Sequence, residues 1–203
     1  MATMQYAGEY HIEVCEIYAA SGAVIDLKDQ FASVNIYEDI FKNALTGDIS
    51  IVDTNNLLTN LPIIGQEKLK LRIVTPNEDD DNSRTMAIDF TDTPLYIYKV
   101  SSKVSINDNT SAYTLSFTTP EAVRSNRIRV TQAFSGEPSI EIVKKIFRDE
   151  DLLNSKKEFY YEETTNNFKF VSPSMRPFDF INSVARRCLS RENNYAPTFL
   201  FYE

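Results

Sequence analysis

The sequence predicts a mainly β protein of the α+β class, in which an antiparallel β-barrel with one short helix is followed by a small α+β domain. Apolar and polar residues alternate in several short segments up to Thr119, as they do in half-buried strands. From Pro120 onward the apolar residues follow helical spacing instead. Aromatic residues make up 12% of the chain without any Trp, and Tyr and Phe rings pack well on pleated strands. We therefore assign residues 1–119 to the barrel domain and residues 120–203 to the small α+β domain.

The first strands of the barrel are predicted by alternation and by turn residues. Residues 10–18 form a strand with one irregularity, and a Ser-Gly turn leads to a second strand region over 24–40. Residues 46–48, Thr-Gly-Asp, are predicted to be a turn, after which Ile49 and Ile51 share one face of a strand. Regular spacing and few glycines favour a closed or nearly closed barrel, and a sandwich is also compatible.

One short helix interrupts the strands. Asp53 or Thr54 can cap residues 55–61 by accepting hydrogen bonds from free backbone N–H groups, and Pro62 ends this helix. The next strand, residues 67–74, alternates cleanly between Leu or Ile and Lys or Arg. Residues 75–85 are predicted to be a solvated hairpin loop, and the remaining strands of the barrel cover 85–92, 94–108 and 111–119.

The second domain opens with Pro120 at a helix start, in a segment that runs to Phe134. Amphipathic spacing predicts helices over 139–153 and 176–190, and residues 157–172 are predicted to be a hairpin that turns at Asn166-Asn167. Residues 197–203, PTFLFYE, are predicted to be a strand. An apolar strand needs a pairing partner. We therefore expect that the domain continues beyond Glu203 or that this strand pairs with another subunit.

Charge and cysteine usage narrow the function classes. The net charge is -8 and the pI about 4.8, so the chain is a poor general binder of nucleic acid, which it could still guide by repulsion. Cys15 and Cys188 are too few for a disulfide framework, and we expect two buried, reduced thiols. The N-terminus lacks the basic and apolar regions of a secretory signal, and no segment is as apolar as a membrane helix. These features predict assembly in the cytoplasm and no membrane insertion.

Catalytic and metal-binding patterns are missing from the sequence. His11 is the single histidine, and its alternating context favours a position on a strand face over a catalytic base. Neither cysteine has metal-ligand spacing, and the adjacent acids of residues 77–81, NEDDD, lack the spacing of a calcium loop. No nucleotide or nucleophile-elbow motif is present. We therefore predict no enzyme, no cofactor and no metal.

Arginines give the second domain a basic character. They lie in two segments, as Arg124, Arg127 and Arg129 and as Arg186 and Arg187, with Arg191 close by. One interpretation is a solvated face with local ion pairs to Glu121 and Glu192. The other is contact with an acidic partner subunit, for which Arg is favoured at interfaces. A nucleic-acid patch is disfavoured because no exposed aromatics clearly interleave the arginines.

Two stretches have a recognisable order of elements. The first, residues 31–73, has a strand, a turn, a strand ending in Asp, the short helix around NLLTNLP, a Gly and a further strand. The second, residues 172–203, has Pro and an aromatic residue opening a helix, followed by a strand of aromatics. Together they resemble the N-terminal half of the baseplate hub proteins of contractile-tailed bacteriophages. The hub family is in turn similar to the N-terminal regions of type VI secretion spikes.

The resemblance implies a tail-tube-like β-barrel followed by a small α+β domain, in a structural protein that links the tail tube to the central spike and forms part of the DNA conduit. The implied partners are copies of itself in a ring, with a trimer as the expected form, the tail tube protein, the spike protein and the tape-measure protein, with DNA only in transit. The implied location is the tail baseplate of a virion. Subunit contacts are expected at the short helix and at the arginines, through Asn55, Leu57, Leu58, Leu61, Arg124, Arg127, Arg129, Arg186 and Arg187.

The family's hubs usually carry two such barrels per chain, and this sequence has room for one. Two other function classes stay open. A soluble β-barrel that binds a ligand or protein would be a monomer with a ligand-sized barrel mouth. A wall-degrading hydrolase would need two carboxylates in a cleft, one of them with a raised pKa.

Overall fold

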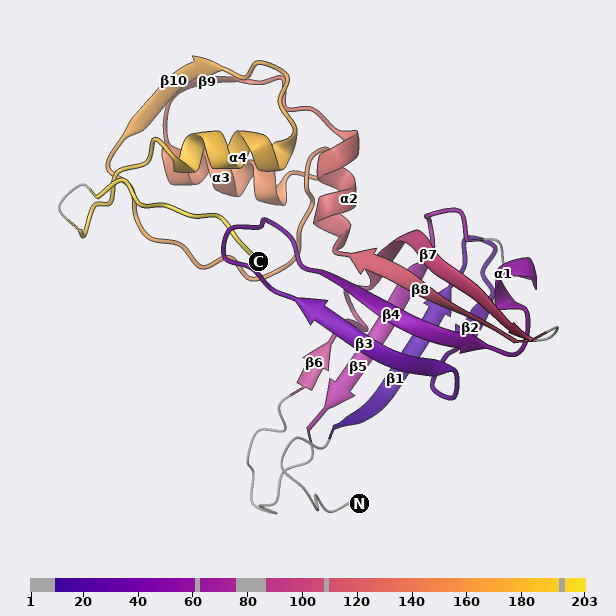
Figure 1. Cartoon of the computed structure of the whole chain (residues 1–203). Coiled ribbons are helices and arrows are strands. Elements are labelled where there is room, and N and C mark those ends of the chain that lie inside the picture. Colours follow the sequence, from indigo (N-terminus) through magenta and orange to yellow (C-terminus); the bar gives the residue numbers. More distant parts are fainter. Residues whose placement is uncertain (1–9, 61–62, 76–86, 108–109, 194–195) are drawn as a thin grey trace. The chain divides into compact units, whose positions relative to one another are not determined.

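The computed structural model describes residues 10–60, 63–75, 87–107, 110–193 and 196–203 (Figure 1). The chain divides into two compact units, which are described separately below. The first unit comprises residues 1–37 and 46–120, and the second comprises 38–45 and 121–203. A single boundary near residue 120 was the expectation from the sequence, and the structure adds the segment 38–45 to the second unit.

The first unit is an antiparallel sheet with one short helix. In chain order its elements are β1 (His11–Tyr18), β2 (Val24–Asp26), β3 (Phe31–Tyr37), β4 (Thr46–Asp53), α1 (Leu57–Asn60), β5 (Lys68–Val74), β6 (Ala87–Asp89), β7 (Leu95–Asn107) and β8 (Thr110–Thr118). The strands lie in the order β2-β1-β5-β7-β8-β4-β3, and β6 pairs with β5. Alternate residues face a core that includes fully buried Leu69, Leu71, Leu115 and Phe117. The predicted mainly β, antiparallel class is therefore confirmed.

The two edge strands of this sheet are consecutive in the chain. Residues 27–30 connect β2 to β3 and also bond to the strands beside them, since the Leu27 N–H donates to the Cys15 carbonyl (2.8 Å) and the Val52 N–H donates to the Gln30 carbonyl (2.8 Å). No ladder joins β2 to β3 among the described strands. The described sheet is thus not a closed barrel, and its two ends are joined through a bonded connection.

Two local predictions for the first unit are wrong. The predicted turn at Thr46-Gly47-Asp48 is instead the start of β4, where Gly47 pairs with Ile36 and Phe117. The single strand region over 24–40 is instead two strands, separated by a turn at which Leu27 is fully buried. The predicted strand over 85–92 is described only as the short β6.

The helix cap is confirmed and assigned to Asp53, whose carboxylate accepts hydrogen bonds from the Asn55 N–H (2.9 Å) and the Leu57 N–H (2.7 Å). Pro62, the predicted end of that helix, and most of the predicted loop over 75–85 lie outside the described residues.

The second unit packs helices against a two-stranded antiparallel sheet. Its elements are α2 (Pro120–Arg127, which begins at the boundary), β9 (Ala133–Pro138), α3 (Ser139–Arg148), β10 (Asn167–Val171) and α4 (Pro177–Ala185). The core joins the buried faces of α3 and α4 to the sheet of β9 and β10, and the rings of Phe134, Phe170 and Phe180 lie 5.4–5.6 Å apart by centroid. None of the described helices is long and apolar enough to span a membrane.

The predicted helix start at Pro120 is confirmed, and this helix ends at Arg127. Two other predictions for the second unit are wrong. The hairpin predicted over 157–172 does not form, because β10 pairs with β9 rather than with residues before Asn166. Residues 197–203 are extended but belong to no strand. Their Phe199 and Phe201 pack on the helical core instead.

Candidate functional site

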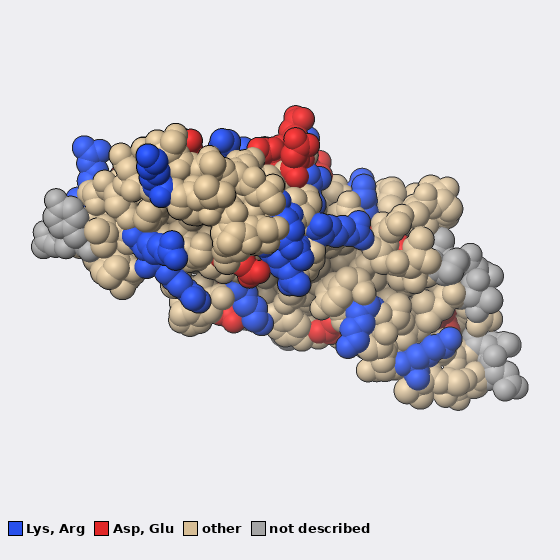
Figure 2. Space-filling view, turned by 90° about the horizontal axis from the view of Figure 1, so that it is seen from above, with Lys and Arg blue, Asp and Glu red and all other residues tan. Residues whose placement is uncertain are grey.

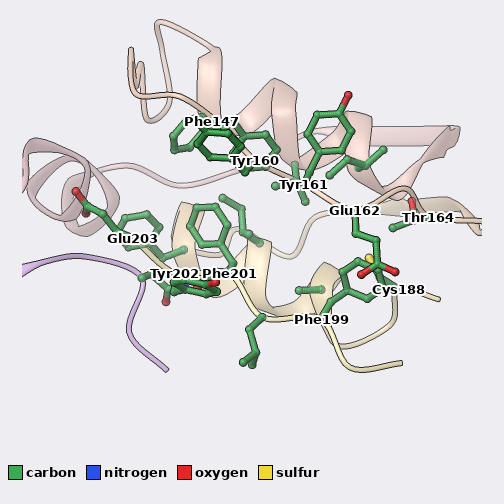
Figure 3. Close-up of a pocket in the computed structure, with 18 of the residues that line it drawn as sticks. Phe147, Tyr160, Tyr161, Glu162, Thr164, Cys188, Phe199, Phe201, Tyr202 and Glu203 are labelled. Carbon is green, nitrogen blue, oxygen red and sulfur yellow. The ribbon is translucent and has the colours of Figure 1, made fainter. Parts of the chain in front are cut away.

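A cleft of about 660 Å³ opens in the second unit between two extended segments (Figure 3). Tyr160, Tyr161 and Glu162 lie on one side of it, and Phe199, Phe201 and Tyr202 lie on the other. We call residues 157–164 the first wall and residues 198–203 the second wall. Side chains of α3 and α4 line the cleft between the walls, including Val143, Phe147, Ile181 and Cys188.

Aromatic rings join the two walls at the base of the cleft. Phe147 of α3 lies 5.1 Å from Phe159 of the first wall and 6.1 Å from Phe201 of the second, measured between ring centroids. Phe159 and Phe201 are 6.4 Å apart, and Phe178 of α4 is 6.0 Å from Phe201. Edge and tilted contacts of this kind stabilise by about 1 kcal/mol each beyond simple burial. The base of the cleft is therefore a fixed apolar surface.

One end of the cleft holds a network of ionic contacts. Lys157 bonds to Glu121 (3.0 Å) and also forms an ion pair with Glu203. The carboxylate of Glu121 is buried and accepts a second hydrogen bond, from the Ser155 hydroxyl (2.6 Å). A buried charge is costly unless it is paired, and Lys157 supplies the pairing for Glu121. Since Lys157 belongs to the first wall and also binds Glu203 of the second, the network links both walls to α2.

The segment 38–45 holds the second wall in place. Asn43 and Asn182 exchange a pair of amide hydrogen bonds of 2.8 and 2.9 Å, and the Asn43 amide also donates to the Phe201 carbonyl (2.6 Å). The backbone N–H of Leu45 donates to the Glu203 carboxylate (3.1 Å). The position of the second wall therefore depends on residues more than 150 positions away in the chain.

Two further glutamates line the cleft. Glu158 follows Lys157 in the first wall, and Glu162, which lies at the end away from Glu203 (Figure 3), accepts a hydrogen bond from the Ser190 hydroxyl. An adjoining hollow is lined by Tyr161, Glu162, Glu163, Glu192 and Asn193. At the outer edge, the amine of Lys144 lies 3.7 Å from the centre of the Tyr161 ring and bonds to Glu141 (2.8 Å). Contacts with Glu141 and Tyr161 raise the pKa of Lys144.

Several of the titratable side chains that line the cleft are buried or paired. Cys188 is buried, its thiol donates to the Val184 carbonyl (3.3 Å), and burial raises its pKa, so it is a poor nucleophile at neutral pH. Within the described part of the chain, no three His, Cys, Asp or Glu side chains are grouped to hold a metal ion. The carboxylates of Glu121 and Glu203 both pair with Lys157.

The arginines of the predicted basic segments do not share a common set of partners. Arg124 is half-buried, and its guanidinium donates to the carbonyls of Glu150 and Leu152. Arg129 donates to the carbonyls of Asn126 and Ile128, and three arginines are exposed without a described ion pair, namely Arg127, Arg186 and Arg187. The expected ion pair with Glu121 is made by Lys157 instead. On the face drawn in Figure 2, Lys and Arg side chains lie in several separate places.

The other predicted contact residues lie around α1. Asn55 is exposed beside the Asp53 cap, Leu57 and Leu58 are half-buried, and Leu61 lies outside the described residues. His11 is exposed at the start of β1. The structure thus brings none of these residues to the cleft.

Sequence reasoning missed the cleft itself. The available signal was the repeated spacing of aromatic residues at two positions, Phe159 with Tyr161 and Phe199 with Phe201. This spacing predicts strand pairing, whereas Phe159, Phe199 and Phe201 pack on the helical core.

Comparisons with known proteins place the fold. No protein-family model matches the chain, and no curated protein sequence is significantly similar to it. Among solved structures, the 43 kDa tail protein of prophage MuSo2 from Shewanella oneidensis superposes with a TM-score of 0.53, at 10% identity, over 88% of this chain and 48% of that one. A tail protein from Neisseria meningitidis gives a TM-score of 0.50, at 12% identity, over 87% and 44%.

A component of the type VI secretion system of E. coli gives a TM-score of 0.42 at 10% identity, over 89% of this chain and 41% of that one, which is too low to establish a shared fold. The chain spans about half the length of the two tail proteins above. The expected fold of phage tail proteins is therefore confirmed at the level of architecture.

Proposed function

We propose that this chain, which has the fold of phage tail proteins, is a structural component of the baseplate hub that joins the tail tube to the central spike. The observation that carries the proposal is the likeness to two tail proteins over 88% and 87% of the chain, which spans both units. The location that follows is the virion tail, after assembly in the host cytoplasm.

The proposed assembly is a ring of several copies, with a trimer as the expected form. The first unit supplies the tail-tube-like sheet, and its exposed apolar side chains offer contact area, among them Val24 at the β2 edge and Tyr37 at the β3 edge. Edge strands with unpaired backbone groups tend to pair with a neighbour or be covered by one. We place further subunit contacts at the exposed residues around α1 and at Arg127, Arg186 and Arg187, where Arg suits an acidic partner.

The DNA conduit is a second part of the proposal. A net charge of -8 would keep a passing phosphate backbone from adhering to the inner wall of a ring. Exchanging exposed acids of the first unit for Lys should slow DNA delivery by assembled particles. Unchanged delivery in every such variant would remove the conduit from the proposal.

The test of the hub role is the assembled mass, measured by native mass spectrometry for the chain alone and mixed with the tail tube, spike and tape-measure proteins of the same particle. A closed oligomer or a stable complex with the tube or spike protein supports the role. A monomer that binds none of these proteins overturns it.

One specific observation favours the alternative class, a ligand-binding module. The volume of the cleft, about 660 Å³, falls within the range of small-molecule sites, roughly 300–1,000 Å³. Both described pockets are lined by the second unit, whereas the sequence suggested a ligand at the mouth of the barrel. A thermal-shift screen of the monomer with aromatic small molecules distinguishes this class from the hub role, which predicts no stabilisation.

A further inference from the structure

Most of each wall belongs to no helix or strand and is unpaired, although Thr164 at the end of the first wall forms an isolated bridge with Ser190. Among the described residues, no backbone N–H or C=O group of 158–162 makes a hydrogen bond. In 198–202 the Phe201 carbonyl is bonded by the Asn43 side chain, and the other backbone groups have no described partner. Extended backbone with free donors and acceptors is a template for an added strand.

Side chains of the second wall alternate as they would in a sheet that covers helices, and in the first wall only Phe159 faces the core, between exposed neighbours. Phe159 and Phe201 pack against the helical core, while Tyr160 is 86% exposed, Leu200 is 54% exposed and Tyr202 is 57% exposed. An inserted strand would place alternate side chains on the apolar base formed by Phe147, Phe159 and Phe201. Its other side chains would meet the exposed rings of the walls.

The charge of the cleft selects the occupant. Four carboxylates line it against a single amine, that of Lys157, which is already paired with Glu121 and Glu203. Glu158 and Glu162 therefore leave the cleft with excess negative charge, and Glu163 and Glu192 extend it into the adjoining hollow. Basic side chains on the occupant would complement this charge.

We propose that the cleft is a docking site for an extended segment of a partner protein, in which apolar residues alternate with Lys or Arg, and which adds as a β-strand against the two walls. Main-chain hydrogen bonds to the walls provide the affinity, the aromatic base receives the apolar side chains, and the glutamates select basic ones. This site is independent of the hub role, because peptide binding by a monomer would support the site even where no ring forms.

The test uses the full chain and a fluorescent octapeptide that alternates Leu and Lys, with binding measured by anisotropy. The control peptides alternate Leu and Glu, or carry N-methyl groups on the backbone of the Leu-Lys sequence. Binding of the Leu-Lys peptide at least tenfold tighter than either control is the expected result, a difference of about 1.4 kcal/mol. Equal binding of all three peptides, or no binding, overturns the proposal.

One pair of variants separates the contribution of backbone hydrogen bonds from that of the side chain. Tyr160→Pro removes one wall N–H at a highly exposed position, whereas Tyr160→Ala keeps that N–H and serves as the matched control. The Pro variant should bind the Leu-Lys peptide about tenfold more weakly than the Ala variant. Equal affinity of the two variants contradicts strand addition.

Charge reversal tests the selection. The double variant Glu158→Lys/Glu162→Lys should lose preference for the Leu-Lys peptide and gain affinity for the Leu-Glu peptide, whereas Glu158→Gln/Glu162→Gln should lower the preference without reversing it. An unchanged preference overturns the charge argument. Self-association of the chain that Tyr160→Pro abolishes would overturn the partner protein as occupant, because the occupant would then be a second copy.

Discussion

Gly47 shows how one residue can mislead a sequence prediction. In a Thr-Gly-Asp context glycine is typical of a turn, yet Gly47 lies inside β4 in extended backbone. A Cβ atom at this position would lie within 3.0 Å of the Phe117 ring and of the Asn35 carbonyl. The glycine is required by a close approach across the sheet rather than by a turn, and that approach involves a residue 70 positions away, which no local pattern reveals.

Gly47→Ala should therefore destabilise the protein by about 1–3 kcal/mol, the usual range for overpacking a core. The measurement is urea unfolding followed by circular dichroism. Adding Phe117→Leu should recover part of the loss, since it removes the ring but leaves the Asn35 carbonyl in place. Strictly additive effects of the two substitutions would contradict this explanation.

The buried thiol of Cys15 predicts how stability depends on pH. Burial, with a smaller contribution from Asp26, raises the pKa of Cys15 from its ordinary value of 9.0 to about 12. Above pH 9 the thiol ionises in the unfolded chain while it stays protonated in the folded one. Its contribution to stability is therefore full below pH 9 and is lost as the pH rises toward 12.

The wild-type chain should lose about 1.4 kcal/mol per pH unit from this thiol between pH 9 and 12. The Cys15→Ala variant lacks this loss, so the difference in unfolding free energy between the two proteins should change by about 2 kcal/mol between pH 8 and pH 10.5. Other groups with raised pKa, such as Cys188 and Tyr113, titrate in both proteins and cancel in the comparison. A pH-independent difference would contradict the prediction.

The alternation of apolar and polar residues predicted strands reliably where a strand pairs within the sheet and buries one face in the core. It predicted β1, β5 and β8 closely, because most of their buried residues recur at every second position. It failed for residues 157–163 and 197–203, where the same alternation arises from rings that pack on α3 and α4. Strand pairing and packing on helices leave the same pattern of inward rings, so the sequence alone could not separate them.

The sequence predicts that helix α1 is capped at its start, but it does not decide which of two residues forms the cap. Asp53 and Thr54 were equal candidates for the cap, and the structure assigns the role to Asp53, which is 2% exposed. Asp53→Ala should cost about 1–2 kcal/mol, as for other N-caps. Thr54→Ala is the matched control, because Thr54 is exposed, and should change stability by less than about 0.5 kcal/mol. Equal effects in thermal unfolding would contradict the assignment.

The second wall should behave as a packed segment rather than as a free strand. Phe201 touches three rings, those of Phe147, Phe159 and Phe178, whereas its neighbour Tyr202 is exposed. Phe201→Ala should cost about 2 kcal/mol, less than the 3–5 kcal/mol of a fully buried ring. Tyr202→Ala should cost less than about 0.5 kcal/mol. Denaturant unfolding of both variants measures the contrast, and similar losses would indicate that the wall is not packed this way.

At the scale of the whole molecule, the chain passes between its two units three times, at residues 37–38, 45–46 and 120–121. The change of pattern at Pro120 revealed the last of these passages. The other two carry no signal in composition or periodicity, because they depend on side-chain hydrogen bonds between Asn43, Asn182 and Phe201. The cleft could not be predicted for the same reason, since both of its walls are positioned by distant partners.

Asn43→Ala should therefore destabilise the second unit, although Asn43 lies among strands of the first unit in sequence. The loss of two amide hydrogen bonds and of the bond to the Phe201 carbonyl should cost about 1–3 kcal/mol. Lys42→Ala is the control, since the Lys42 side chain is exposed and its described contact is a surface ion pair with Asp39. Combining Asn43→Ala with Asn182→Ala in a double-mutant cycle should give a coupling energy of about 1 kcal/mol, and additivity would argue against the contact.

The wide separation of Asn43 from Phe201 has a consequence for the order of events on the ribosome. The two residues are 158 positions apart, so at about 5–20 residues per second the segment 38–45 waits roughly 8–30 s for its partner. During that time β3 and β4 can already pair, while the loop between them lacks first Asn182 and then Phe201. All of the contacts described for this loop can form only when residues 199–203 leave the exit tunnel, so a segment made early in translation is fixed late.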